Sequence, residues 1–149
     1  MFQQGLDGLY GTFVHWLVLI FLIIATITDI RSYKIPNWLN GTFFALRLAI
    51  IPIVGIGFDH VIGAVVAFIA LFIPAFVKMQ KMGGDIKCAT VLGLYLGISL
   101  IPAHLLLASA LLALYTLIQY VVFKKGGMLP FAPFFLSAHL ILWGVYAVM

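Results

Sequence analysis

The sequence predicts an all-α fold: a polytopic membrane protein built as a bundle of about six transmembrane helices. Composition is the first reason, because 65% of the 149 residues are hydrophobic, only 8% are charged, and the mean hydropathy is +1.24. The second reason is run length, since crossing ~30 Å of hydrocarbon takes roughly 20 residues of helix. Strands of a membrane barrel would be about 10 residues long and would alternate apolar with polar residues, a pattern that is missing here.

Residues that favour turns separate the apolar runs and fix the expected helices in order. Pro36 and the Pro102–His104 stretch are two examples of such breaks between helices. None of the connections is long enough for a second domain, so residues 1–149 are expected to form one integral-membrane domain. The predicted spans are 12–29, 36–55, 59–78, 86–102, 104–123 and 129–148.

The lysines and arginines predict the orientation of these spans. If the chain crosses the membrane at each span, seven of the eight basic residues fall on one side, and Arg47 lies inside the second span. The positive-inside rule makes that side cytoplasmic and puts both termini outside. The net charge of +4 then reflects topology and does not indicate nucleic-acid binding. Residues 1–11 have no basic n-region, so the first helix is expected to be retained. The seven residues are Arg31, Lys34, Lys78, Lys81, Lys87, Lys124 and Lys125.

The same topology sorts the four aspartates of a chain that has no glutamate. Asp7 and Asp59 are predicted outside, whereas Asp29 and Asp85 each fall at the cytoplasmic end of a span. A carboxylate costs about 2.5 to 3.5 kcal/mol at the centre of a membrane helix and less near the interface. Two carboxylates at one depth therefore suggest a pair.

Structural roles would also explain both residues. Asp85 follows two glycines and precedes a helix, where an aspartate caps free backbone N–H groups and meets the positive end of the helix dipole. Asp29 is placed to form an ion pair with Arg31 or Lys34 at the water boundary. Neither role excludes catalysis.

Small residues recur every four positions after Asp85, at Ala89, Gly93 and Gly97. Such a ridge allows another helix backbone to approach closely within a membrane. The first span also has small residues, Ala25 and Thr26, one turn before Asp29, so we expect these two helices to pack together with both aspartates at the same end.

Three motifs occur in a fixed order: "TDIRSYKIPNWLN" from Thr28 to Asn40, "MGGDIK" from Met82 to Lys87, and "LPFAPF" from Leu129 to Phe134. Together they resemble the type IV prepilin peptidase family, intramembrane aspartic proteases of the GxGD type. The resemblance covers the whole chain and implies that Asp29 and Asp85 are the catalytic residues. One departure is that Met82 stands where the signature has its first glycine.

The resemblance also implies the reaction and its setting. Two carboxylates that share a site do not both ionise cheaply, so one keeps a proton while the other activates a water that attacks the peptide bond. The implied substrate is a prepilin or pseudopilin with a short basic leader, cut at the cytoplasmic boundary of the bacterial inner membrane. Cys88 is the only cysteine, so the paired CxxC segment of two-activity members is missing. The chain therefore resembles the short, peptidase-only form of tight-adherence or Flp pilus systems, for which no cofactor is expected.

Supporting roles are predicted around the aspartates. Gly83 and Gly84 would let the backbone bend and a substrate strand approach, and Lys87 completes this supporting loop. Structural readings again compete: Pro130 or Pro133 can start the last helix, and Asn37 and Asn40 can cap the second. The residues predicted to contribute to a substrate groove are Pro36, Asn37, Pro130, Phe131 and Pro133.

Other chemistries find less support in the sequence. The four histidines, His15, His60, His104 and His139, show no HExxH or other close spacing, so we expect packing roles and no metal site. A serine hydrolase would need a GxSxG motif, which is missing. The main rival from another class is a small proton- or ion-coupled carrier that uses Asp29 and Asp85, and a membrane scaffold is a third possibility.

Overall fold

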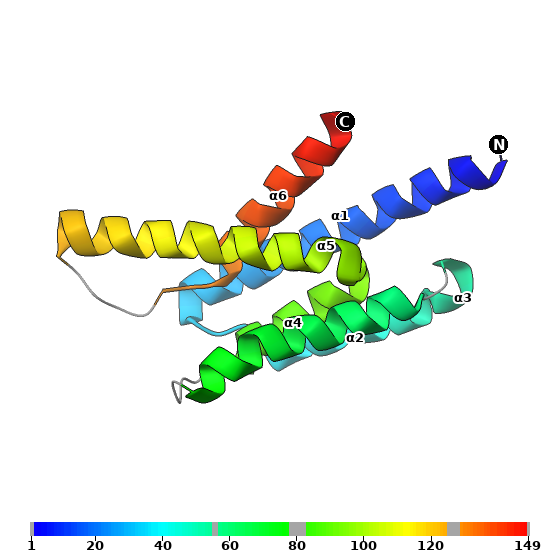
Figure 1. Ribbon diagram of the computed structural model, residues 1–149. Coiled ribbons are helices and arrows are strands. Elements are labelled where there is room, and N and C mark those ends of the chain that lie inside the picture. Colours follow the sequence, from blue (N-terminus) through cyan, green and yellow to red (C-terminus); the bar gives the residue numbers. More distant parts are fainter. Residues whose placement is uncertain (1, 55–56, 78–82, 125–128, 149) are drawn as a thin grey trace.

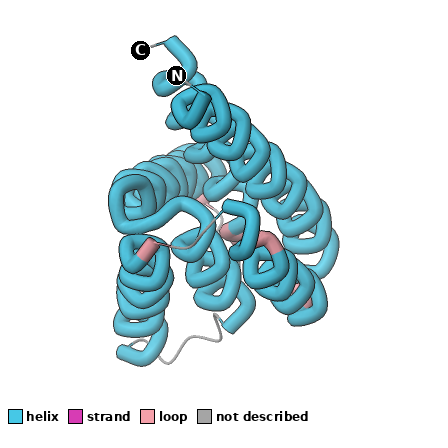
Figure 2. The backbone as a smooth tube through the Cα atoms, turned by 90° about the vertical axis from the view of Figure 1, so that its right-hand side faces the viewer, coloured by secondary structure: helices cyan, strands magenta, loops and turns pink. Residues whose placement is uncertain are grey.

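A computed structural model describes the backbone of residues 2–54, 57–77, 83–124 and 129–148. Within these ranges the chain is helical apart from short connections and contains no strand, as Figures 1 and 2 show from two directions. The predicted all-α class is confirmed. The elements are α1 (Phe2–Ser32), α2 (Asn37–Ala49), α3 (Ile51–Val54), α4 (Phe58–Val77), α5 (Gly83–Ile118), the π-helix η1 (Gln119–Phe123) and α6 (Ala132–Val148).

Three stretches are long and apolar enough to cross a membrane: Gly11–Ser32, Phe58–Val77 and Gly83–Phe123. Large apolar side chains also point outward, and Phe58 and Phe76 are 79% and 72% exposed. Exposed apolar surface on this scale is what a lipid-facing helix needs and what a soluble monomer avoids. The chain is a membrane protein.

The predicted count of six helices is not confirmed, since the part of the chain that the structure describes has five helices longer than one turn. The predicted spans 86–102 and 104–123 belong to one element, α5, followed by η1. Pro102, where a break was predicted, lies inside the helix, and the chain departs from helical geometry at Gly97 instead. Figure 1 shows α5 turning back at this bend, so that its two arms, residues 83–96 and 98–118, run in nearly opposite directions.

Gly97 breaks the helix because its backbone has φ 71° and ψ 174°, a conformation that side chains disfavour. The break frees carbonyl groups at the end of the first arm, and a buried, unpaired carbonyl is costly in lipid. Arg47 of α2 meets one of them: its Nε donates a hydrogen bond of 3.2 Å to the Leu94 carbonyl. The guanidinium is 1% exposed and lies over the Tyr95 ring at 5.6 Å. This contact explains why one arginine sits within a predicted span.

The predicted small-residue ridge is confirmed, but the helix packed against it is α4 and not the first span, which is part of α1. A Cβ built on Gly63 of α4 would lie 2.6 Å from the Gly97 carbonyl carbon and 2.7 Å from the Gly93 carbonyl oxygen. A Cβ on Gly93 would in turn collide with the Gly63 backbone. The two backbones therefore touch directly, which only glycine allows.

The arrangement in Figure 1 brings the basic helix ends together. The C-terminal end of α1, the start of α5 and the end of η1 lie on the left, whereas the N and C labels lie on the right. Arg31 is in the last turn of α1, Lys87 near the start of α5, and Lys124 directly after η1. Lys78, Lys81, Lys125 and Met82 lie outside the described residues.

The glycine contact between α4 and α5 gives a stability prediction. Gly93→Ala forces a methyl group into the Gly63 backbone, so we expect a loss of about 1 to 3 kcal/mol of stability despite the better helix propensity of alanine. The measurement is the unfolding temperature of the purified protein in detergent. Gly144→Ala is the matched control, because a Cβ at this helical glycine meets no atom within 4 Å. Equal unfolding temperatures for the two variants would contradict the contact.

Candidate functional site

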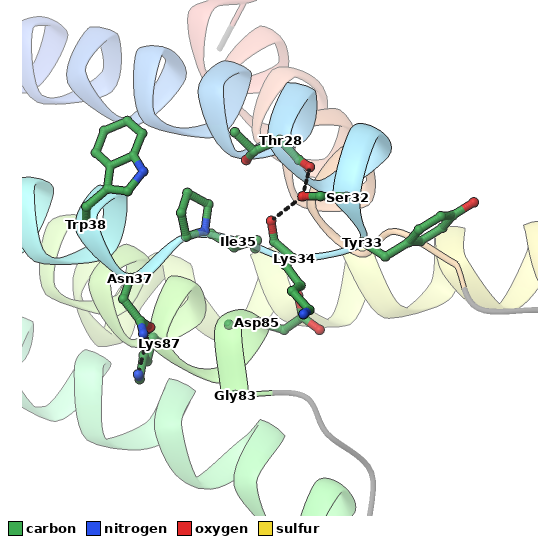
Figure 3. A pocket seen from close by; sticks show the side chains of 12 residues that line it. Thr28, Ser32, Tyr33, Lys34, Ile35, Asn37, Trp38, Gly83, Asp85 and Lys87 are labelled. Carbon is green, nitrogen blue, oxygen red and sulfur yellow. Dashed lines mark hydrogen bonds between the residues drawn. The ribbon is translucent and has the colours of Figure 1, made fainter.

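The site lies at the basic end of the bundle, where α1 ends and α5 and α6 begin. Residues 33–36 join α1 to α2, and Tyr33 takes a left-handed conformation with φ 51° immediately after α1. The Ser32 hydroxyl donates to the Thr28 carbonyl at 2.8 Å, which closes the last turn of α1. Figure 3 shows these side chains on one side of a cavity and the start of α5 on the other. The end of α1 and the starts of α2 and α5 therefore converge on one cavity.

Asp29 lies on the last turns of α1 and is only 3% exposed. Its Oδ2 accepts a hydrogen bond of 2.9 Å from the backbone N–H of Ala132, the first residue of α6. The first N–H groups of a helix have no partner within the helix, and a carboxylate there also meets the positive end of the dipole. The structure thus shows a capping role for Asp29, although the capping role was predicted for Asp85. The described residues show no ion pair between Asp29 and Arg31 or Lys34.

Asp85 lies in the first turn of α5 and lines a cavity of about 640 Å³. Thr28 and Ser32, which flank Asp29 on the last turns of α1, line the same cavity. Cys88 lies fully buried one turn further along α5. Residues 29 and 85, far apart in sequence, are therefore brought to the same end of the bundle. The other cavity-lining residues are Thr28, Ser32, Tyr33, Lys34, Ile35, Pro36, Asn37, Trp38, Gly83, Gly84 and Lys87.

The rim of this cavity is accessible, because the Tyr33 and Trp38 side chains are 53% and 62% exposed. Asp85 reaches the cavity directly, whereas Asp29 is absent from the lining and lies behind it, bound to α6. Water that enters the cavity therefore meets Asp85 first.

The two glycines before Asp85 have different surroundings. A Cβ on Gly84 would lie 3.1 Å from the Ile35 carbonyl oxygen and 3.3 Å from the Ile35 nitrogen, whereas a Cβ on Gly83 would meet nothing within 4 Å. Gly84 therefore lets the start of α5 pack against the connection 33–36. Gly83 leaves open space beside Asp85.

Two asparagines tie α2 to the same turn of α5. The Lys87 ammonium donates to Asn37 Oδ1 at 2.8 Å, and Asn40 Nδ2 donates to the Gly84 carbonyl at 3.5 Å. The predicted capping role of Asn37 and Asn40 is wrong, since Pro36 occupies the N-cap of α2 and no side chain caps this helix. Both asparagines instead link α2 to the first turns of α5, which carry Asp85, and nothing in the local sequence pattern indicates these contacts.

The "LPFAPF" segment reaches the site through its backbone. Pro133 is the second residue of α6, which confirms that a proline occupies the first helical turn. Phe131 is buried against Phe135 with ring centroids 4.8 Å apart. Pro130, Phe131 and Pro133 are not among the residues that line the cavity, unlike Pro36 and Asn37. The segment's contact with the aspartates is the Ala132 N–H bond to Asp29.

Three of the four histidines gather elsewhere in the core, one each from α1, α5 and α6. The His15 and His139 rings have centroids 5.5 Å apart, and His104 lies 5.9 Å from His139. Within the described ranges no group of three or more histidine, cysteine or acidic residues is arranged to hold a metal ion. The fourth histidine, His60, lies in the first turn of α4. Its Nε2 is 3.9 Å from Oδ2 of Asp59. Sequence spacing did not reveal this cluster because its members lie on different helices.

Comparison with protein families identifies a related family. The model of the type IV leader peptidase family matches residues 16–117, which is more than half of the chain. No curated protein and no solved structure matches the chain. The matched region contains both Asp29 and Asp85.

The Asp29 cap predicts a stability difference between two substitutions. Asp29→Ala leaves the Ala132 N–H without a buried acceptor and should cost about 1 to 2 kcal/mol, measured by thermal unfolding in detergent. Asp29→Asn is the matched control, because an amide oxygen still accepts the bond and should preserve most of the stability. If alanine and asparagine destabilise the protein equally, the hydrogen bond contributes nothing.

Proposed function

This chain belongs to the type IV leader peptidase family, and we propose that it is an intramembrane aspartic endopeptidase that removes the leader of prepilin-like proteins. The catalytic pair in this proposal is Asp29 and Asp85, which act on a bound water. The observation that carries it is the convergence of the two helix ends on one cavity: Asp85 lines it together with Thr28 and Ser32, which flank the buried Asp29 on the last turns of α1. A membrane protein gains little stability from two neighbouring carboxylates, so their juxtaposition calls for a chemical role.

The proposed mechanism is general acid and base catalysis. Two carboxylates that share a site do not both ionise cheaply, so in the proposed mechanism one is neutral while the other accepts a proton from the water that attacks the scissile carbonyl. The neutral partner donates its proton to the developing oxyanion; the carboxyl that took the water's proton then gives it to the leaving amine, and the other carboxylate recovers the hydroxyl proton as the intermediate collapses. Asp29 contributes to this reaction while its Oδ2 holds the Ala132 N–H, because a carboxylate has a second oxygen available for other partners. The helix cap thus fixes the orientation of a reacting group.

The accessible rim supports a cut made at the membrane boundary. Peptide hydrolysis needs water, and the cavity reaches exposed Tyr33 and Trp38 at the end of the bundle where the basic residues gather. By the positive-inside rule, that end of the bundle lies on the cytoplasmic side of the inner membrane and both termini lie on the outer side. The substrate is then a prepilin or pseudopilin whose short basic leader lies on the cytoplasmic side. The single cysteine supports the peptidase-only form that serves tight-adherence or Flp pili, with no cofactor.

The paired role of the aspartates predicts a loss of activity without a loss of fold. Asp29→Asn and Asp85→Asn should each reduce the rate of prepilin cleavage by a factor on the order of 10³ or more, and the double variant should be scarcely worse. Non-additivity is expected because each residue is useless without the other. The measurement is the cleavage rate of purified variants at matched concentrations.

Asp59→Asn is the control for these variants, since Asp59 lies at the start of α4, far from the cavity-lining residues, and should retain activity. Substantial cleavage by Asp29→Asn or Asp85→Asn would refute the aspartic-protease reading. The carrier that uses the same two aspartates would then become the better proposal.

The gathering of basic helix ends predicts the orientation. In intact cells, a membrane-impermeant thiol reagent should label Asp59→Cys from outside and should not label Lys124→Cys. The native Cys88 is fully buried and gives a low background. The opposite labelling pattern would place the aspartates on the outer side and remove the basis for a cytoplasmic cut.

A further inference from the structure

A second hollow begins where the aspartate cavity ends. It has a volume of about 380 Å³ and shares Asn37 and Lys87 with that cavity. Beyond these two residues it runs along α2 past Asn40, Gly41 and Phe44, with Phe68 of α4 and Val91 of α5 as its further walls. The residues from 37 to 44 span about 10 Å, or two turns of helix. The groove therefore leads from the site of cleavage into the part of the bundle that the bilayer surrounds.

The groove has room for a helix. Gly41 faces it, and a Cβ built on this glycine would meet no atom within 4 Å. Phe44 and Phe68 are 45% and 42% exposed, so their rings form an accessible apolar rim. A small residue between apolar walls is the pattern that lets one membrane helix approach another closely.

Asn40 supplies an independent observation. It lines the groove and is only 4% exposed, and its Oδ1 has no hydrogen-bond partner among the described residues. Its Nδ2 donates to the carbonyl of Gly84, the residue directly before Asp85. A buried carbonyl oxygen without a donor is costly, so this atom is suited to an N–H group that arrives with a ligand.

We propose that this groove receives the first turns of the substrate's apolar helix, immediately after the scissile bond, and that Asn40 Oδ1 accepts a backbone N–H from it. The inference rests on the proposed function and identifies the part of the substrate that this side of the site recognises. The first four N–H groups of any helix lack partners within the helix, and lipid cannot satisfy them. Asn40 offers an acceptor at the depth where such a helix would begin. The groove thus binds the start of the substrate helix, and the aspartates cleave the extended part of the substrate that precedes this helix.

This proposal is tested by the cleavage kinetics of variants in which a larger side chain fills the groove. The probe is a prepilin whose leader the wild-type chain removes, and the variants are Gly41→Ala and Gly41→Leu. Filling the open space should raise KM in the order of side-chain size, on the order of tenfold for leucine, while kcat changes little. Gly144→Leu is the matched control, since this exposed helical glycine also has open space around it but lies on α6, away from the groove. The control should keep the wild-type KM.

Cross-linking tests the position of the helix without relying on kinetics. In the Asp85→Asn background, Gly41→Cys should form a disulfide on oxidation with cysteines placed along the substrate helix, at positions three or four residues apart. Gly144→Cys should form none. An unchanged KM for Gly41→Leu, or cross-links that are equal at positions 41 and 144, would overturn the proposal and leave the groove to lipid. If the wild-type chain cleaves no prepilin, the proposed function itself fails, and the groove proposal falls with it.

Discussion

Lipid offers no hydrogen bonds to a protein backbone, and this constraint explains where the chain places its buried charges. Two helix ends lie inside the bundle: the break at Gly97 frees carbonyls, and the start of α6 presents free N–H groups. Arg47 donates to the Leu94 carbonyl at the first, and Asp29 accepts the Ala132 N–H at the second. Each charge matches the sign of the helix end that it meets, so the cost of burying it is offset by the backbone group that it satisfies.

Asp29 therefore has two roles. As a cap it joins α1 to α6, and in the proposed reaction it shares a proton with Asp85. The glycine contact between α4 and α5 supports the second role, because it fixes the first arm of α5, whose opening turn carries Asp85. Gly84 and Asn40 then secure that turn against Ile35 and α2. The positions of the two carboxylates thus depend on the close packing of backbone segments around them.

The sequence predicted features with strong local signals and missed those made by distant residues. Composition and run length predicted helical membrane spans, and four-residue spacing predicted the ridge at Gly93 and Gly97. The break was misplaced because proline was taken as the stronger breaker, yet Pro102 remains helical while a positive φ at Gly97 bends the chain. The links from Asn37 to Lys87 and from Asp29 to Ala132 span 50 and 103 positions. Nothing in the periodicity of one segment specifies a partner on another, so these roles needed the structure.

The bond between Asp29 and Ala132 also has a consequence for biosynthesis. A chain is made from its N-terminus, so α1 enters the membrane well before the residues of α6 exist. Until then the carboxylate of Asp29 has no helix end to cap, and its orientation is not fixed. The last helix therefore acts as the closing step of assembly: a nascent chain that already contains both aspartates has yet to acquire the group that holds one of them in place.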